Sequence, residues 1–329
     1  MAGSEKFRSV SLHSITPGEP LPFRVAIFYK GKHLVFRKPG QQMEVAIYNK
    51  FVYRQIHRIF IPEEDFAKYL DYQKVKEEAE RSLLQNPKYS PEQQALERLT
   101  SSVKALSDAL FASEDLASLE ENVRKSLEIS KATVKAVLAK PYFGIYTMLS
   151  QKADTVANHS MRVSVLATLL GYQLGFVNPL ALEQLAAAGI LHDIGKTKLT
   201  LSDPFDESIP ASEKEAMDAE IMKQHPVVSC DMLSKMPFVP QEVTRIIREH
   251  HESRDGTGYP NRLRGSSMYG LSKVFTIANT FDSLVSSPQD GDALELHARA
   301  LLKMDKELRN QFDQALLTKA LAFLTLKRP

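Results

Sequence analysis

Hydrophobic and polar residues alternate along residues 23–38, FRVAIFYKGKHLVFRK, on both sides of Lys30-Gly31-Lys32. Alternation around a short turn that contains glycine predicts a β-hairpin. The apolar, β-branched run at 56–61 predicts a further strand, which Pro62 should end because proline cannot continue a strand interior.

Two segments beside these strands are interpreted as helices. They are 43–55, whose pattern is more ambiguous, and 63–84, which is rich in charged residues with apolar residues between them. Residues 1–73 are therefore expected to form a small mixed α/β domain. We expect a regulatory role for it, since no motif in it points to chemistry.

Residues 74–140 are polar, low in glycine and helical in pattern. Apolar residues recur every three or four positions at 95–110, which indicates an amphipathic helix. This range is interpreted as a helical linker, or as a helix pair through which the protein forms a homodimer.

The pattern of 141–329 is almost purely helical. In 211–225, Ser212 and Glu215 have the spacing of a capping box. The segment 159–175 places one apolar stripe on a helix, formed by Val163, Leu166, Ala167 and Leu170. The fold class is therefore predicted to be α+β overall, with an all-α helical bundle at the C-terminus.

Composition narrows the class of protein. The chain has 329 residues, 43% of them hydrophobic, and a net charge of +2. That balance argues against binding DNA or RNA through bulk charge. The single cysteine, Cys230, indicates a reducing compartment. Without a signal segment or an apolar run of membrane-spanning length, the chain is expected to be soluble and cytoplasmic, with no membrane partner.

Histidines are concentrated in one stretch of the chain. Any one of them taken alone is more often a core histidine bonded to a carbonyl group. Five of the nine lie between 159 and 251, one is followed by Asp193, and two are adjacent. Together they predict a metal site with the ligands His159, His192, Asp193, His225, His250 and His251.

Five imidazoles and one carboxylate are too many for one open catalytic site, but they suffice for two metals if Asp193 bridges them. Paired divalent metals assist displacement at phosphorus. Lys196 lies four residues after His192, so it is expected on the same helix face, where it can neutralise charge on a phosphoryl oxygen.

These residues stand in a sequence of motifs that resembles the HD-GYP family, bacterial phosphodiesterases of the HD superfamily that hydrolyse cyclic di-GMP. The resemblance covers roughly 145–325. It is carried by HSMRV, LHDIGK, MKQHP, HHESRDGTGYP and the C-terminal helix pattern FDQALLTKALAFL. It implies a helical bundle with metals at its centre, Asp193 as the bridging ligand and Lys196 near the scissile phosphate.

The resemblance also implies a role for the loop Asp255-Gly256-Thr257-Gly258-Tyr259-Pro260. Glycine permits positive φ angles, so a rigid turn is one interpretation. The other is a surface for the substrate or for diguanylate cyclase (GGDEF) domains, as the resemblance implies.

The sequence departs from the family pattern in four places. The segment 197–210, TKLTLSDPFDESIP, replaces the usual run after Lys196 and is expected to border the site as an unusual lid. The motif AD-x-x-DAL is replaced by ANTFDSL, so Asn279 stands at a ligand position and only Asp282 is retained. Thr155 replaces a glutamate that adds a third metal in some members, so two metals are expected. An arginine that contacts substrate is also absent, because the corresponding residues are Ser287, Pro288 and Gln289.

Three functions remain open. The first is a phosphodiesterase that converts cyclic di-GMP to pGpG or GMP. The second is a degenerate signalling module that binds metal, with or without nucleotide, but acts through protein contacts. The third is a phosphohydrolase for another nucleotide. The resemblance favours iron as the metal, while the mixed ligand set also permits manganese or zinc.

Overall fold

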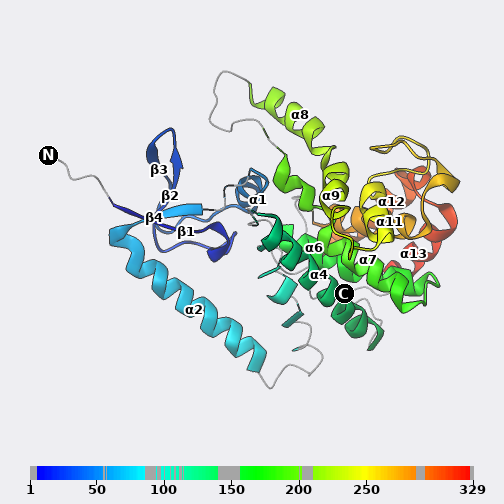
Figure 1. Cartoon of the computed structure of the whole chain (residues 1–329), viewed down its shortest axis with the longest axis horizontal. Coiled ribbons are helices and arrows are strands. Elements are labelled where there is room, and N and C mark those ends of the chain that lie inside the picture. The colour runs from blue at the N-terminus through cyan, green and yellow to red at the C-terminus, as the bar shows by residue number, and fades with distance from the viewer. Residues whose placement is uncertain are drawn as a thin grey trace. The chain divides into compact units, whose positions relative to one another are not determined.

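The chain is described by a computed structural model, which divides into two compact units, 1–98 and 99–329. Figure 1 shows the whole chain, and each unit is described by itself. The described residues are 6–54, 56, 58–85, 94, 98–99, 101–103, 105–106, 109–110, 113, 115–139, 156–199, 201, 210–286 and 293–326.

The first unit contains a four-stranded antiparallel sheet with the strand order β1-β4-β2-β3. Its strands and helices are β1 (Phe7–Ser11), β2 (Val25–Tyr29), β3 (Lys32–Arg37), α1 (Val45–Tyr53), β4 (Arg58–Pro62) and α2 (Phe66–Gln85), with short 3₁₀ turns η1 (Leu12–Ser14) and η2 (Glu63–Asp65). This architecture confirms the prediction of a small mixed domain.

The predicted hairpin is β2 and β3, and its turn residues Lys30 and Gly31 both have positive φ angles, 45° and 79°. Such a turn matches the twist of the flanking strands. The ambiguous segment 43–55 is helical, as predicted, in α1. Strand β1 is a short strand that pairs with β4 at the sheet edge, and it was not predicted from the sequence.

Asp65 joins the loop before β2 to the start of α2. Its buried carboxylate accepts hydrogen bonds from the backbone N–H of Arg24 at 3.2 Å and from Arg24 Nε at 2.7 Å. Lys68 Nζ lies 2.9 Å from the other oxygen. Although burial raises the pKa of Asp65, these donors lower it to about 2. The ionised carboxylate therefore fixes the loop before β2 to the start of α2.

The described secondary structure of the second unit is helical, apart from one isolated β-bridge between Asp255 and Arg264. Its helices are α4 (Leu116–Ala139), α6 (Val156–Gln173), α7 (Pro179–Leu191), α8 (Ala211–Met222), α9 (His225–Leu233), α10 (Gln241–Glu249), α11 (Gly270–Val285), α12 (Ala293–Lys306) and α13 (Gln314–Leu326), with 3₁₀ turns η3 (Ile194–Lys198), η4 (Gly265–Ser267) and η5 (Arg309–Gln311). The predicted all-α bundle and the predicted C-terminal helix are confirmed.

Helices α6 and α7 pack closely at the centre of this bundle (Figure 1). A Cβ atom on Gly189 would lie 2.3 Å from the Cα of Ser164, so only glycine allows this approach. Ser164 Oγ donates to the carbonyl of Ala186 at 2.8 Å, which fixes the relative position of the two helices. The predicted apolar stripe on α6 is buried, with each of its four residues at 0% exposure.

Some predicted features differ from the structure or fall outside it. The capping box at Ser212 and Glu215 is wrong: α8 begins after Pro210, and no side chain caps its N-terminus. Helix α4, within the predicted linker 74–140, packs against α6 and α7 and so adds to the bundle. The helix predicted at 95–110 lies partly outside the described residues. The boundaries at 73/74 and 140/141 stay predictions.

Within the described part of the chain, no helix is both long enough and apolar enough to span a membrane.

Candidate metal centre

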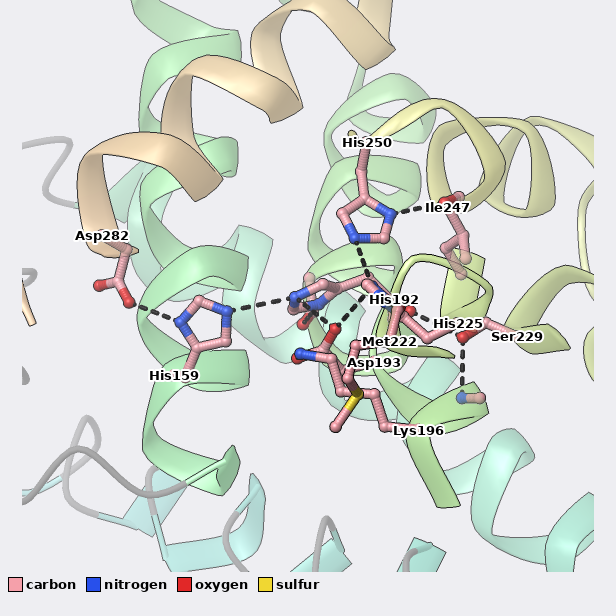
Figure 2. A network of polar contacts seen from close by, with 12 residues as sticks. His159, His192, Asp193, Lys196, Met222, His225, Ser229, Ile247, His250 and Asp282 are labelled. Atoms are coloured by element: carbon pink, nitrogen blue, oxygen red, sulfur yellow. Dashed lines mark hydrogen bonds and ion pairs between the residues drawn. The ribbon is translucent and has the colours of Figure 1, made fainter. Parts of the chain in front are cut away.

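Four histidines reach one buried site from the ends or first turn of four helices. His192 and His250 are the C-cap residues that directly follow α7 and α10, and His225 begins α9. His159 lies in the first turns of α6. Figure 2 shows these side chains converging. Because these helices begin or end at the site, side chains from four separate segments can meet there.

The Nδ1 atom of each of these histidines is used by a neighbouring acceptor. His192, His225 and His250 each donate to the carbonyl three residues before them, at Gly189, Met222 and Ile247, over 3.0, 2.6 and 2.6 Å. His159 Nδ1 lies 2.8 Å from Asp282 Oδ2. Because Nδ1 carries the proton, the lone pair of each neutral ring is on Nε2, facing the site.

These lone pairs face one another in two pairs. His159 Nε2 lies 3.3 Å from His192 Nε2, and His225 Nε2 lies 3.1 Å from His250 Nε2. Two lone pairs at this distance repel unless a cation lies between them. Metal–nitrogen bonds of about 2.0–2.1 Å place two ligands of one ion about 2.9–3.4 Å apart. The observed spacing fits one cation for each pair.

Asp193 lies between the two pairs. Its Oδ1 is 3.5 Å from His192 Nε2 and 3.3 Å from His225 Nε2. This oxygen is buried and has no hydrogen-bond donor among the described residues. A buried carboxylate oxygen without a donor is costly, and a divalent cation would satisfy it. The position suits a bridging ligand.

The ligand candidates form two clusters in the described chain. One is His159, His192 and Asp193, and the other is His225, His250 and His251; in each, the ligand atoms lie within 4.8 Å of one another. The arrangement is consistent with a binuclear centre. The identity of the metal does not follow from these ligands.

Burial keeps four of these histidines uncharged. It lowers the pKa of His192, His225 and His250 to about 3, and the pKa of His251 well below its usual value. Burial acts to raise the pKa of Asp193, but electrostatic interactions with His192 and Lys196 hold that pKa well below the ordinary range. Neutral imidazoles and an ionised carboxylate are the protonation states that bind divalent metals.

Lys196 is the cation beside the site, but its setting differs from the predicted one. Helix α7 ends at Leu191, so Lys196 lies in η3 rather than on a helix face shared with His192. Its Nζ is 2.6 Å from Asp193 Oδ2, and 17% of its side chain remains exposed. It neutralises the carboxylate and reaches the solvent side of the site.

Asn279 belongs to the face of α11 that lines the same region. Four residues before it, Phe275 contacts the rings of His192 and His250, with centroids 5.6 and 6.1 Å apart. Three residues after it, Asp282 contacts His159. Helical spacing therefore places Asn279 between these contacts. Its buried Oδ1 accepts no hydrogen bond from a described residue, which suits a metal ligand.

Side chains behind the ligands hold them in place, and these residues were not predicted from the sequence. Arg162, 1% exposed, donates to both oxygens of Asp282 at 2.8 and 3.0 Å. Ser229 donates to the carbonyl of His192 and accepts from the backbone N–H of Gly195, each at 2.8 Å. The only sequence signal was an arginine three residues after His159, one helical turn away.

The glycine-rich loop folds back onto the end of α10. Tyr259 stacks on His251, with ring centroids 4.7 Å apart, and its backbone N–H donates to the carbonyl of His251 at 3.0 Å. A Cβ on Gly258 would lie 2.4 Å from the backbone nitrogen of Ser253. Gly256 has a φ angle of 83°, and burial raises the pKa of Tyr259 to about 12.

The rest of the loop is held by carboxylates. Buried Glu252 accepts from the backbone N–H groups of Asn261 and Leu263 at 2.6 and 2.8 Å. Asp255 is exposed and accepts from the backbone and hydroxyl of Thr257. Pro260, also in the loop, follows a cis peptide bond. The loop is thus a fixed wall beside His251, with Asp255 and Thr257 facing solvent.

Several departures noted in the sequence lie outside the described residues. They are Thr155 and the trio Ser287, Pro288 and Gln289, together with 202–209 of the segment that follows Lys196.

Comparison with known proteins gives the family. A model of the HD domain family matches residues 145–316. A 3′3′-cGAMP-specific phosphodiesterase of Vibrio cholerae is 31% identical over 181 residues, which cover 54% of this chain and 38% of that protein. A cyclic di-GMP phosphodiesterase of Pseudomonas aeruginosa is 32% identical over 130 residues, or 39% of this chain and 30% of the relative. The chain thus spans about a third of the length of these curated relatives.

Among solved structures, Bd1817, an HDG"Y"P protein from Bdellovibrio bacteriovorus, is similar over 97% of this chain and 100% of its own. The TM-score is 0.59 and the sequence identity 18%. At this identity the likeness concerns the fold.

Proposed function

The chain belongs to the HD domain family, with relatives of the HD-GYP type, and from this premise we propose that it is a phosphodiesterase that hydrolyses cyclic di-GMP to pGpG or GMP. The proposal assigns it a binuclear centre of two divalent ions, for which we favour iron over manganese and zinc.

One observation carries this proposal. The Nε2 atoms of His159 and His192 face each other at 3.3 Å, and those of His225 and His250 at 3.1 Å. The carboxylate of Asp193 lies between these two pairs. A site for one metal would need only three or four of these donors. The arrangement supports two cations bridged by Asp193.

Two divalent ions held here would supply Lewis acidity at a phosphoryl group. The protein's own contribution is to hold the ligands and to supply positive charge. His251 and Asn279 are proposed to complete the two ligand sets. Lys196, which is bonded to Asp193 and partly exposed, is proposed to approach the phosphate and to reduce the negative charge that develops on its oxygens.

The nucleobases of the substrate differ among the relatives. The relatives include proteins described as specific for 3′3′-cGAMP and proteins described as acting on cyclic di-GMP. We propose cyclic di-GMP as the preferred substrate because the motif resemblance points to it. A direct competition between the two dinucleotides distinguishes these substrates.

The test is turnover by the full chain purified without oxygen and loaded with ferrous iron or manganese. Product nucleotides are quantified by chromatography with cyclic di-GMP, 3′3′-cGAMP and linear pGpG as substrates. We expect cyclic di-GMP hydrolysis and its loss in Asp193→Asn. Asp231→Asn is the matched control, since this exposed aspartate pairs with Arg248 away from the site. Equal activity in the Asp193 variant would remove the bridging assignment.

A second candidate function is a degenerate module that binds metal without turnover. Asn279 favours it, because a neutral amide where the family pattern has aspartate lowers the negative charge of the centre. In this case the loop 255–260 is proposed to contact diguanylate cyclase domains, and the first unit to be regulatory. Stoichiometric metal with no hydrolysis of any of the three nucleotides would favour this alternative.

Homodimer formation through the predicted linker 74–140 is part of the same proposal. Sedimentation of the full chain tests it.

A further inference from the structure

A cavity of about 460 Å³ lies in the second unit on the side of α7 that faces α4 and α10. Its walls are the apolar side chains Leu127, Leu180, Ala187, Phe238, Pro240 and Val243. This volume lies in the range of about 300–1,000 Å³ that is typical of small-molecule sites. None of the metal-ligand candidates lines it.

Gln184 gives the floor of this cavity a polar group. Its side chain is only 7% exposed, and it lines the cavity. It makes no hydrogen bond with any residue in the described ranges. Its amide atoms are not among the fully buried polar atoms that lack a partner in the described ranges, so solvent in the cavity reaches them. The amide of Gln184 is therefore open to a polar group of a ligand in this cavity.

Arg124 gives the rim a cation that is open to an anion. Its guanidinium lies 3.6 Å from the centre of the Phe238 ring and forms no ion pair with a described residue. The other rim cation, Lys131, is paired with Glu128 at 2.9 Å. Glu183 also lines the cavity, so a ligand with a single negative charge fits better than one with several.

We propose that this cavity binds a small organic monoanion. The apolar body enters between α4, α7 and α10, Gln184 bonds a polar group on that body, and Arg124 holds its carboxylate or phosphate. Guanidinium groups bind both anions by paired hydrogen bonds.

The cavity shares two helices with the metal centre. Helix α7 contributes Gln184 and Ala187 to the cavity and is followed directly by His192, while α10 contributes Val243 and is followed directly by His250. A ligand that changes the spacing of α7 and α10 must change metal affinity, and by linkage metal must change ligand affinity by the same factor. This coupling, unlike the binding itself, rests on the proposed metal site.

The binding test uses 8-anilinonaphthalene-1-sulfonate, an aromatic monoanion, titrated into the metal-free full chain with fluorescence as the readout. We expect one saturable site, weakened at least fivefold in Arg124→Gln and a few-fold in Gln184→Leu. Lys125→Gln is the matched control: it removes the neighbouring charge on α4, which pairs with Glu121 outside the cavity. Equal affinity in the Arg124 and Lys125 variants, or no saturable site, would overturn the proposal.

Displacement identifies the source of the anion. Octanoate displacing the probe supports a carboxylate ligand, and 3′,5′-cyclic GMP, whose phosphodiester carries a single negative charge, displacing it supports a nucleotide phosphate. If neither displaces it at millimolar concentration, the proposed ligand class is wrong. A repeat with manganese-loaded protein tests the coupling, for which we expect at least a twofold change in probe affinity. Equal affinities would overturn the coupling and leave the site standing.

Discussion

Arg162 and Asp282 form a buried ion pair in which both guanidinium-to-carboxylate bonds are 2.8–3.0 Å long, and the same carboxylate accepts from His159. A carboxylate behind a metal-binding imidazole fixes the ring and strengthens its lone pair. We therefore infer that Asp282 positions His159, and that Arg162 keeps Asp282 ionised and in place. The pKa of Asp282 accordingly lies far below its usual value, although burial acts to raise it.

Asp282→Asn is expected to weaken metal binding about 10–100-fold, as loss of such a partner typically does. The measurement is metal content after dialysis, with manganese affinity by electron paramagnetic resonance. This variant leaves Arg162 without its carboxylate, so it should also unfold more easily. The double variant Arg162→Met, Asp282→Asn removes both charges and should recover thermal stability without recovering metal affinity. Wild-type metal affinity in the double variant would contradict the positioning role.

Asn279→Asp should increase metal affinity. Replacing the neutral amide with a carboxylate of the same length adds a negative charge beside the proposed cations, and we expect about a tenfold gain. Isothermal titration with manganese, at a pH near 7, measures it. Asn279→Ala should weaken binding. If both variants bind manganese like the wild type, Asn279 is not a ligand.

Gly258→Ala should destabilise the loop that packs on His251. The added Cβ would lie 2.4–2.6 Å from backbone atoms of Ser253, His251 and Glu252. The backbone would have to shift to relieve these contacts, which costs free energy. Overpacking of this kind costs about 1–3 kcal/mol. Chemical denaturation provides the free energy of unfolding. Gly270→Ala is the matched control because the nearest atom to its Cβ is 3.9 Å away. Equal stability of the two variants would show that the loop moves freely.

Asp65 should make the first unit sensitive to acid. Its folded pKa of about 2 is below the ordinary value of 3.8, so its stabilising effect is complete above pH 4 and is lost as the pH falls through about 2. We expect about 1 kcal/mol, because Arg24 and Lys68 remain partly exposed and water screens their charges. Thermal unfolding from pH 2 to 7 should show a smaller slope in Asp65→Asn. Parallel curves for the two proteins would exclude this contribution.

The sequence was sufficient for the features that depend on local pattern. Alternation and a Lys-Gly turn determined the hairpin, and apolar spacing determined the buried stripe of α6. Motif order identified the histidines and Asp193 as a set. The capping box failed because the chain enters α8 through Pro210, and short-range spacing does not show which residue begins a helix.

Only the tertiary structure decided how these residues meet. His159 and His192 are 33 positions apart, and His225 and His250 are 25 positions apart. Their Nε2 atoms nevertheless face each other at 3.3 and 3.1 Å. The partnership of Arg162 with Asp282, the buried amide of Gln184 and the edge strand β1 likewise depend on contacts between distant segments. Sequence periodicity determines which face of an element is buried, whereas the packing of helix on helix determines which side chains that face meets.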